Sequence, residues 1–160
     1  MIRQCAWLPG IITTVIEDCE ALRSLYRRHG EWHRAGSTIV HQADRSAELY
    51  VVLDGQVEFW VRSTGGRRVL STAGPGAVFG EVACFAGGAR SASATALTDC
   101  AVLRLSRAAA LELIERSPGF AMQVVRTLGE RLYAATHGEP AAPAPLHSID
   151  DLLAGAFRAA

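Results

Sequence analysis

Near the start of the chain, between residues 11 and 26, apolar residues recur every three or four positions. Drawn at 3.6 residues per turn, they fall on one side of a helix: Ile11, Ile12, Val15, Ile16, Cys19, Leu22, Leu25 and Tyr26. Thr14 and Glu17 have the spacing of a capping box. The pattern predicts an amphipathic helix within an N-terminal segment that covers residues 1–31.

After Gly30 the pattern changes to short runs that alternate or are rich in β-branched residues, which predicts strands. Asp54-Gly55 lies between two of these runs and predicts a tight hairpin turn. Closely spaced short strands favour a small antiparallel sandwich or roll over residues 32–105. The predicted strands are STIVH (37–41), ELYVVL (48–53), QVEFWV (56–61), RRVLST (67–72), RSASATAL (90–97) and CAVLRLS (100–106).

Helical spacing returns in residues 106–137. A short stripe begins after Ser106 and ends near Ser117, with Ala109, Ala110, Leu113 and Ile114 as its apolar members. Ser117-Pro118 then has the signature of an N-cap followed by the first residue of a helix. A longer helix is expected from there to about Thr136, with Phe120, Val124, Leu128 and Leu132 on one side.

The last segment, residues 138–160, starts with a linker rich in proline and alanine. Ser148 then precedes a second small apolar stripe at helical spacing, formed by Ile149, Leu152, Leu153, Ala156 and Phe157. This stripe is interpreted either as packing onto the domain or as a helix that docks on a partner.

Composition narrows the class of protein. In 160 residues, 16 basic side chains balance 16 acidic ones, so the net charge gives no reason to expect nucleic acid or an anionic membrane as a partner. The four cysteines have no C-x-x-C spacing, and His29, His33 and His41 are interpreted as solvated, so no metal site is predicted. Without an apolar run of membrane-spanning length or a signal peptide, a cytoplasmic location is expected.

One stretch, Phe79 to Ala96, carries the candidate chemistry. Gly80 and Glu81 begin a predicted buried turn of helix whose first N–H groups have no intrahelical partner and suit an anion. Arg90 offers a fork of donors for the same anion, and Ser91 adds a hydroxyl. Glu81 would repel a phosphate but accept a hydrogen bond from a neighbouring sugar hydroxyl. A phosphate joined to a ribose is the ligand that satisfies these groups.

Three motifs resemble the cyclic-nucleotide-binding domain family, which includes the catabolite activator protein and the regulatory subunits of protein kinase A. The motifs are Ala35-Gly36, LYVVLDGQVEFW (49–60) and FGEVACFAGGARSA (79–92), and the resemblance extends over about residues 32–136. It implies an α+β, mainly β fold: an eight-stranded antiparallel, jelly-roll-like β-roll with an N-terminal helix, a short helix in a phosphate-binding cassette at 79–92, and C-terminal lid helices at 106–137.

The resemblance also implies roles for individual residues. Arg90 would pair with the cyclic phosphate, and Glu81 would accept from the ribose 2′-OH. The remaining cassette ligands would be Gly80, Val82, Ala83, Ser91 and Ala92. The base pocket would be lined by Phe59, Leu70, Ser71 and Thr136. The sequence departs from the family at Ala43-Asp44, where Gly-Asp is common, and in having no proline before Arg90.

The sequence-based hypothesis is a stand-alone receptor for cAMP, with cGMP as the other candidate, that relays occupancy to a protein effector through the lid helix and tail. A monomer is favoured over a dimer, because Gly138-Glu139-Pro140 ends the lid helix. Direct DNA binding is not expected, since 20 residues after Pro140 leave no room for a DNA-binding element. The alternatives are a ligand-independent interaction module and a regulator without its own DNA-binding domain. An enzyme is not expected, because no catalytic group adjoins the cassette.

Overall fold

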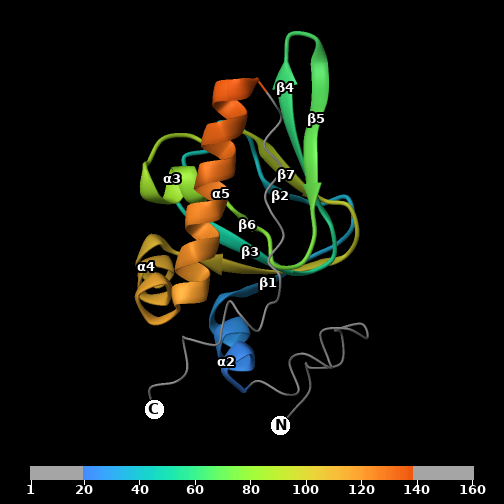
Figure 1. The fold of residues 1–160 in the computed structure, drawn as a ribbon. Coiled ribbons are helices and arrows are strands. Elements are labelled where there is room, and N and C mark those ends of the chain that lie inside the picture. The colour runs from blue at the N-terminus through green and yellow to red at the C-terminus, as the bar shows by residue number, and fades with distance from the viewer. Residues whose placement is uncertain (1–19, 139–160) are drawn as a thin grey trace.

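A computed structural model gives the fold and describes residues 20–138 (Figure 1). These residues form four helices and eight strands. The elements are α2 Glu20–His29, β1 Gly30–His33, β2 Thr38–Val40, β3 Leu49–Asp54, β4 Val57–Ser63, β5 Gly66–Ala73, β6 Val78–Phe79, α3 Glu81–Phe85, β7 Ser93–Ala96, β8 Cys100–Leu105, α4 Arg107–Arg116 and α5 Pro118–His137.

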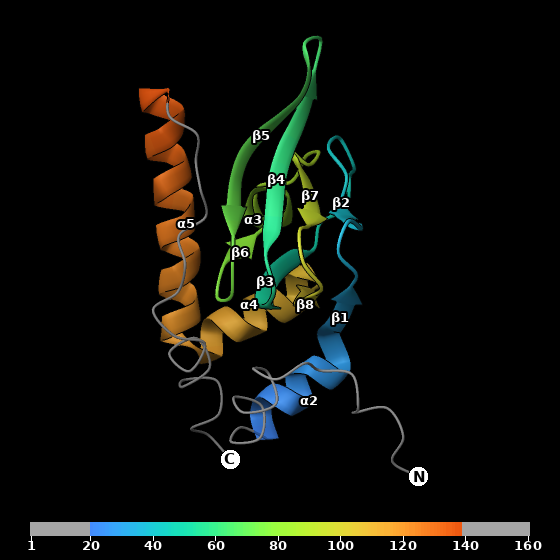
Figure 2. The ribbon, with the colours of Figure 1, turned by 90° about the vertical axis from the view of Figure 1, so that its right-hand side faces the viewer.

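The strands form two four-stranded sheets in which every pair is antiparallel. One sheet has the order β1-β8-β3-β6 and the other the order β2-β7-β4-β5. Figure 2 shows α5 along one flank of this roll and the β4–β5 hairpin projecting beyond it. The expected eight-stranded antiparallel roll, with a short cassette helix and C-terminal helices, is confirmed.

Alternation along β3 divides the apolar interior in two. Leu49, Val51 and Leu53 face the helices and form the helix-side core with residues of β8, α2, α4 and α5. Tyr50 and Val52 face the opposite sheet and form the roll core with Val57, Phe59, Phe79 and Val102. One sheet therefore supports both the helices and the interior of the roll.

Two sequence-based predictions about strands need correction. Asp54-Gly55 is not a hairpin turn, because β3 and β4 belong to different sheets. The turn instead carries the chain from one sheet to the other. Gly55 has φ 87° and packs against the backbone around Asp99 and Cys100, where a Cβ has no room. The strands β1 and β6 were not predicted; β6 has two residues, too few for a periodic signal.

The predicted starts of both C-terminal helices are confirmed. The Ser106 hydroxyl accepts from the Ala109 amide at the start of α4, and the Ser117 hydroxyl accepts from the Phe120 amide at the start of α5. Gly138, in the left-handed conformation, ends α5. The predicted single face of α5 is wrong, however: Phe120 and Val124 are buried, whereas Leu128 and Leu132 are exposed.

Several predictions fall outside the described residues. They are the first half of the N-terminal stripe with its Thr14–Glu17 capping box, and the tail beyond Gly138. Of the predicted N-terminal helix, α2 is the described part. Within residues 20–138, no helix is long and apolar enough to cross a membrane.

Candidate functional site

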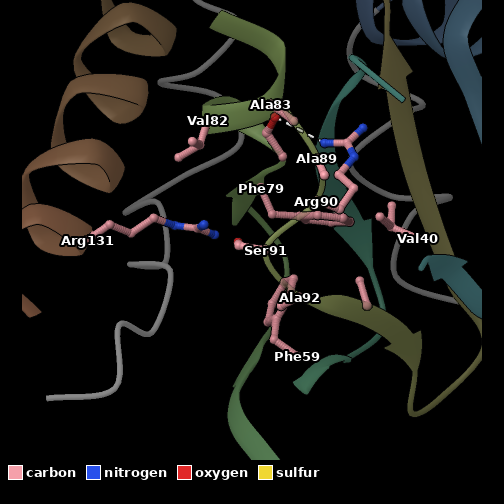
Figure 3. A pocket seen from close by; sticks show the side chains of 12 residues that line it. Val40, Phe59, Phe79, Val82, Ala83, Ala89, Arg90, Ser91, Ala92 and Arg131 are labelled. Carbon is pink, nitrogen blue, oxygen red and sulfur yellow. Dashed lines mark hydrogen bonds between the residues drawn. The ribbon is translucent and has the colours of Figure 1, made fainter. Parts of the chain in front are cut away.

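A pocket opens between the roll and the first turn of α3, on the side that faces α5 (Figure 3). The space between its walls, including the part that is open to solvent, is about 420 Å³. The roll and cassette supply most of the lining, and α5 supplies one residue, Arg131. The lining residues are Val40, Phe59, Phe79, Gly80, Val82, Ala83, Ala89, Arg90, Ser91, Ala92, Ala94 and Arg131.

Gly80 is the N-cap of α3 and has φ 83°, a left-handed conformation that favours glycine. A Cβ at this position would collide with the Arg90 guanidinium and lie 2.9 Å from the Glu48 carbonyl oxygen. Glycine is therefore required both for the turn that starts α3 and for the close approach of Arg90.

Arg90 is nearly buried and is held by groups of its own chain. Its Nε donates to the Ser46 hydroxyl at 3.0 Å, and its two terminal nitrogens donate to the carbonyl oxygens of Gly80 at 3.1 Å and Glu48 at 2.7 Å. The Glu48 carboxylate lies 3.6 Å away. Figure 3 shows the guanidinium directed toward the backbone of α3. The positive charge is thus fixed at the wall of the pocket by three hydrogen-bond acceptors and one nearby carboxylate.

Glu81, the first residue of α3, is completely buried, and neither of its carboxylate oxygens has a hydrogen-bond partner in the structure. Arg131 of α5 approaches one of them, with Nε 2.8 Å from the oxygen, but the two groups are not aligned for a hydrogen bond. Burial raises the pKa of Glu81, although the charges of Arg131 and Arg90 favour the ionised form. The carboxylate therefore has acceptor capacity that the protein itself leaves unused.

The other predicted cassette ligands lie around the same opening. Val82 and Ala83 are in the first turn of α3, whose amides have no intrahelical partner. Ser91 is exposed and Ala92 is partly exposed on the segment that leads into β7. Gly80, Val82, Ala83, Arg90, Ser91 and Ala92 all line the pocket, so the structure brings this part of the predicted set together, whereas the buried Glu81 is not among the lining residues.

The residues predicted for the base pocket are divided. Phe59 of β4 lines the pocket and packs edge-on against Phe79, with ring centroids 5.1 Å apart. Leu70 and Ser71 lie on the adjacent strand β5, outside the lining, although the buried Ser71 hydroxyl has no hydrogen-bond partner. Thr136 is exposed near the end of α5, where its hydroxyl contacts the Leu132 and Tyr133 carbonyls of its own helix.

Sequence reasoning missed Arg131. Figure 3 shows its side chain extending from α5 toward Ser91, across the opening of the pocket. Its position in the helix places it on the buried side of α5: it lies one helical turn after Thr127 and one before Ala134, both of which are buried. A basic residue on the buried face of an amphipathic helix requires a partner, and here that partner is Glu81.

Comparison with known proteins places this geometry in a family. The family profile described as cyclic nucleotide-binding domain matches residues 31–117. The cyclic AMP receptor protein of Thermus thermophilus is 40% identical over 120 residues, which make up 74% of this chain and 55% of that protein. A CRP-like cAMP-activated global transcriptional regulator of Mycobacterium tuberculosis is 32% identical over 98 residues, 61% of this chain and 44% of the regulator.

A solved structure agrees. The crystal structure of the Thermus thermophilus catabolite activator protein superimposes with a TM-score of 0.64 at 34% sequence identity, covering 73% of this chain and 56% of that one. The chain spans about half the length of the curated relatives it matches. The matched region is the cyclic nucleotide-binding domain.

Proposed function

The chain belongs to the cyclic nucleotide-binding domain family, and we propose that it is a cytoplasmic receptor for a purine 3′,5′-cyclic monophosphate, with cAMP preferred over cGMP. The preference follows the relatives, which are named for cyclic AMP. The observation that carries the proposal is the buried Glu81, which has unused acceptor oxygens beside a pocket that also presents Arg90 and Ser91.

The phosphate, the ribose and the base of the proposed ligand would each meet different groups of the site. The anionic phosphate would lie against the first-turn amides of α3, near Arg90 and the Ser91 hydroxyl, because amides and a guanidinium both stabilise negative charge. The ribose 2′-OH would donate to Glu81, supplying a hydrogen bond that the ligand-free pocket lacks. Phe59 would face the base, as would Leu70, Ser71 and Thr136 if α5 and β5 close over it.

Relay to an effector protein would pass through α5. Arg131 joins α5 to the carboxylate that the ribose would use, so a ligand that bonds to Glu81 competes with this contact. The position of α5 would then differ between the free and occupied states, which is what a population shift requires. The proposed role is binding and relay, without catalysis.

A ligand-independent interaction module is the second candidate. It is favoured by the acceptors around Arg90: Ser46, Glu48 and Gly80 already engage the guanidinium without any phosphate. In this interpretation Arg90 is a structural residue that ties the cassette to the loop before β3. Direct titration separates the two candidates.

The test is isothermal titration calorimetry of the purified chain with cAMP and with cGMP. We expect saturable one-site binding, tighter for cAMP. Ser91→Ala removes an exposed hydroxyl and should weaken binding several-fold, whereas Arg90→Ala should weaken it about tenfold to a hundredfold, the range for a hydrogen bond to a charged group. Arg68→Ala, an exposed arginine on β5 away from the pocket, is the matched control and should bind normally.

Because Arg90 also bonds to Ser46 and Glu48, the unfolding midpoint of each variant is measured alongside. Absence of heat with either nucleotide in the folded wild type rejects the receptor and favours the interaction module. Wild-type affinity in both folded variants rejects the assigned ligand groups.

A further inference from the structure

Arg104 of β8 lies between two glutamates that come from the neighbouring strands. Its Nη1 donates to the carboxylate of Glu31 on β1 at 3.1 Å, and its Nη2 donates to that of Glu48, directly before β3, at 2.6 Å. Because β8 lies between β1 and β3 in the sheet, the guanidinium joins the strands on both sides of its own. The two carboxylates hold Arg104 in place, although 45% of its side chain is exposed.

The carboxylate of Glu48 faces two arginines but forms a hydrogen bond with only one of them. Its Oε1 accepts from Arg104, whereas its Oε2 lies 3.6 Å from Nη2 of Arg90, too far for a hydrogen bond. Oε2 is buried and has no hydrogen-bond partner among the described residues. Burial favours the protonated form of Glu48, but hydrogen bonds, chiefly that from Arg104, and the charges of both arginines hold its pKa below the usual value of 4.5.

Arg90 keeps part of its hydrogen-bonding capacity unused by the described residues. A guanidinium has five N–H donors, and the bonds to Ser46, Gly80 and the Glu48 carbonyl occupy three of them. One donor remains on each terminal nitrogen. The carboxylate of Glu48 needs only a short shift to take the one on Nη2. In that position it would neutralise the charge of Arg90 and occupy a donor that suits a ligand anion.

We propose that Arg104 is a positioning residue for the anion site: by holding the carboxylate of Glu48, it keeps that group off Arg90 and leaves the Arg90 charge available to a ligand phosphate. The identity of the anion rests on the proposed function, but the arrangement of the side chains does not. Arg104 is not among the residues that line the pocket (Figure 3), so its effect passes through Glu48. Without Arg104, the charges of Glu31 and Glu48 would outnumber the positive charge of Arg90 beside the pocket.

A crystal structure of the ligand-free Arg104→Ala variant tests the arrangement without any nucleotide. We expect the Glu48 carboxylate to lie about 2.8 Å from Nη2 of Arg90, the distance of a charge-assisted hydrogen bond. Arg104→Lys keeps a positive charge and a donor at the same position, so it should leave the carboxylate off Arg90. A carboxylate that stays beyond hydrogen-bond distance of Arg90 in Arg104→Ala would overturn the proposal.

Calorimetric titration with cAMP tests the consequence for binding. Arg104→Ala should weaken binding about fivefold, the upper range for an ion pair that is partly exposed. Glu48→Gln should tighten it about twofold, because a neutral amide no longer offsets the charge of Arg90. In the Glu48→Gln background, Arg104→Ala should have no further effect. The matched control is Arg45→Ala, which removes an exposed arginine from the loop before β3 and should bind as wild type does.

The two measurements distinguish failure of this proposal from failure of the proposed function. A wild type that binds no nucleotide would reject the proposed function, and the crystal structure would still decide whether Arg104 holds Glu48. Equal weakening by Arg104→Ala in the wild-type and Glu48→Gln backgrounds would mean that Arg104 acts on the ligand by its own charge, which overturns the proposal. Weaker binding by Glu48→Gln would also overturn it, because the carboxylate would then support Arg90 rather than compete for it.

Discussion

Glu81 and Arg131 form an ion pair in which the protein leaves the buried carboxylate without an aligned hydrogen-bond donor. The carboxylate is fully buried and lacks an aligned donor, while Arg131 remains a quarter exposed, with 25% of its side chain accessible. A buried charge that is only partly compensated costs stability. This cost is the reason to look for a ligand at the position.

The pH dependence of stability follows from the same residue. Burial raises the pKa of Glu81 above its usual value of 4.5, so the folded state binds a proton more readily than the unfolded state. Stability from this group is complete below the usual value and is lost as the pH rises through the raised pKa. We expect Glu81→Gln to melt about 1 to 3 °C higher than wild type at pH 7, with the gap closing below pH 4.5.

Thermal melting of both proteins between pH 3.5 and 7.5 measures this difference. The exposed Glu115→Gln on α4 is the control and should track wild type throughout. A Glu81→Gln variant that melts lower at pH 7 would show that the contact with Arg131 outweighs the cost of burial.

At the scale of residues, the sequence predicts what local chemistry determines and misses what the fold brings together. The Gly80-Glu81 step and Arg90-Ser91 are close in sequence, so their shared site was visible as a motif. Arg131 comes from a helix 50 residues after Glu81, and the contact between them depends on how α5 packs. The same reason leaves Ser46 and Glu48, which hold Arg90, without any signal in the sequence.

Among the elements, α5 was predicted most accurately in its limits and least accurately in its faces. The N-cap, proline and terminal glycine mark its ends by local backbone chemistry. Its faces are harder to predict because apolar residues cover both, and periodicity alone does not say which face meets the roll. Leu128 and Leu132 were therefore grouped with Phe120, although they point to the outer side.

The caps of α4 and α5 offer a matched comparison of one interaction in two environments. Each serine accepts from an amide three residues on at 3.2 Å, but Ser106 is exposed and Ser117 is completely buried. We expect Ser117→Ala to cost about 2 kcal/mol, because water cannot replace the lost acceptor, and Ser106→Ala about 0.5 kcal/mol. Urea unfolding measures both, and equal losses would contradict the role assigned to burial.

Across the whole molecule, the sheet β1-β8-β3-β6 separates two apolar interiors and belongs to both. Val51 and Leu103 face the helices, while Tyr50 and Val102 face the pocket side. Short strands at regular spacing predicted the roll, but the division of strands between sheets was not predictable, because pairing over long sequence separations leaves no local pattern. The Asp54-Gly55 turn was misassigned for this reason.

Ligand binding should stabilise the molecule as a whole under the proposed function. A ligand that binds only the folded state at about 100 times its Kd adds about 2.7 kcal/mol, which raises the melting temperature by several degrees. We expect this shift with cAMP in wild type and in Arg68→Ala, and a much smaller one in Arg90→Ala. Differential scanning fluorimetry over a range of nucleotide concentrations measures it, and identical shifts in all three proteins would contradict a site at Arg90.

The pocket receives a single side chain from α5, that of Arg131, while all its other walls come from the roll and the cassette. If the proposed function holds, the roll and the cassette therefore bind the ligand, α5 transmits the change, and the Arg131 side chain links the two. Arg131→Ala would leave most of the pocket lining intact while removing the link between the pocket and α5. Such a variant would be a receptor that still binds its nucleotide but no longer changes the position of α5. It would serve as a binding module for the construction of sensors.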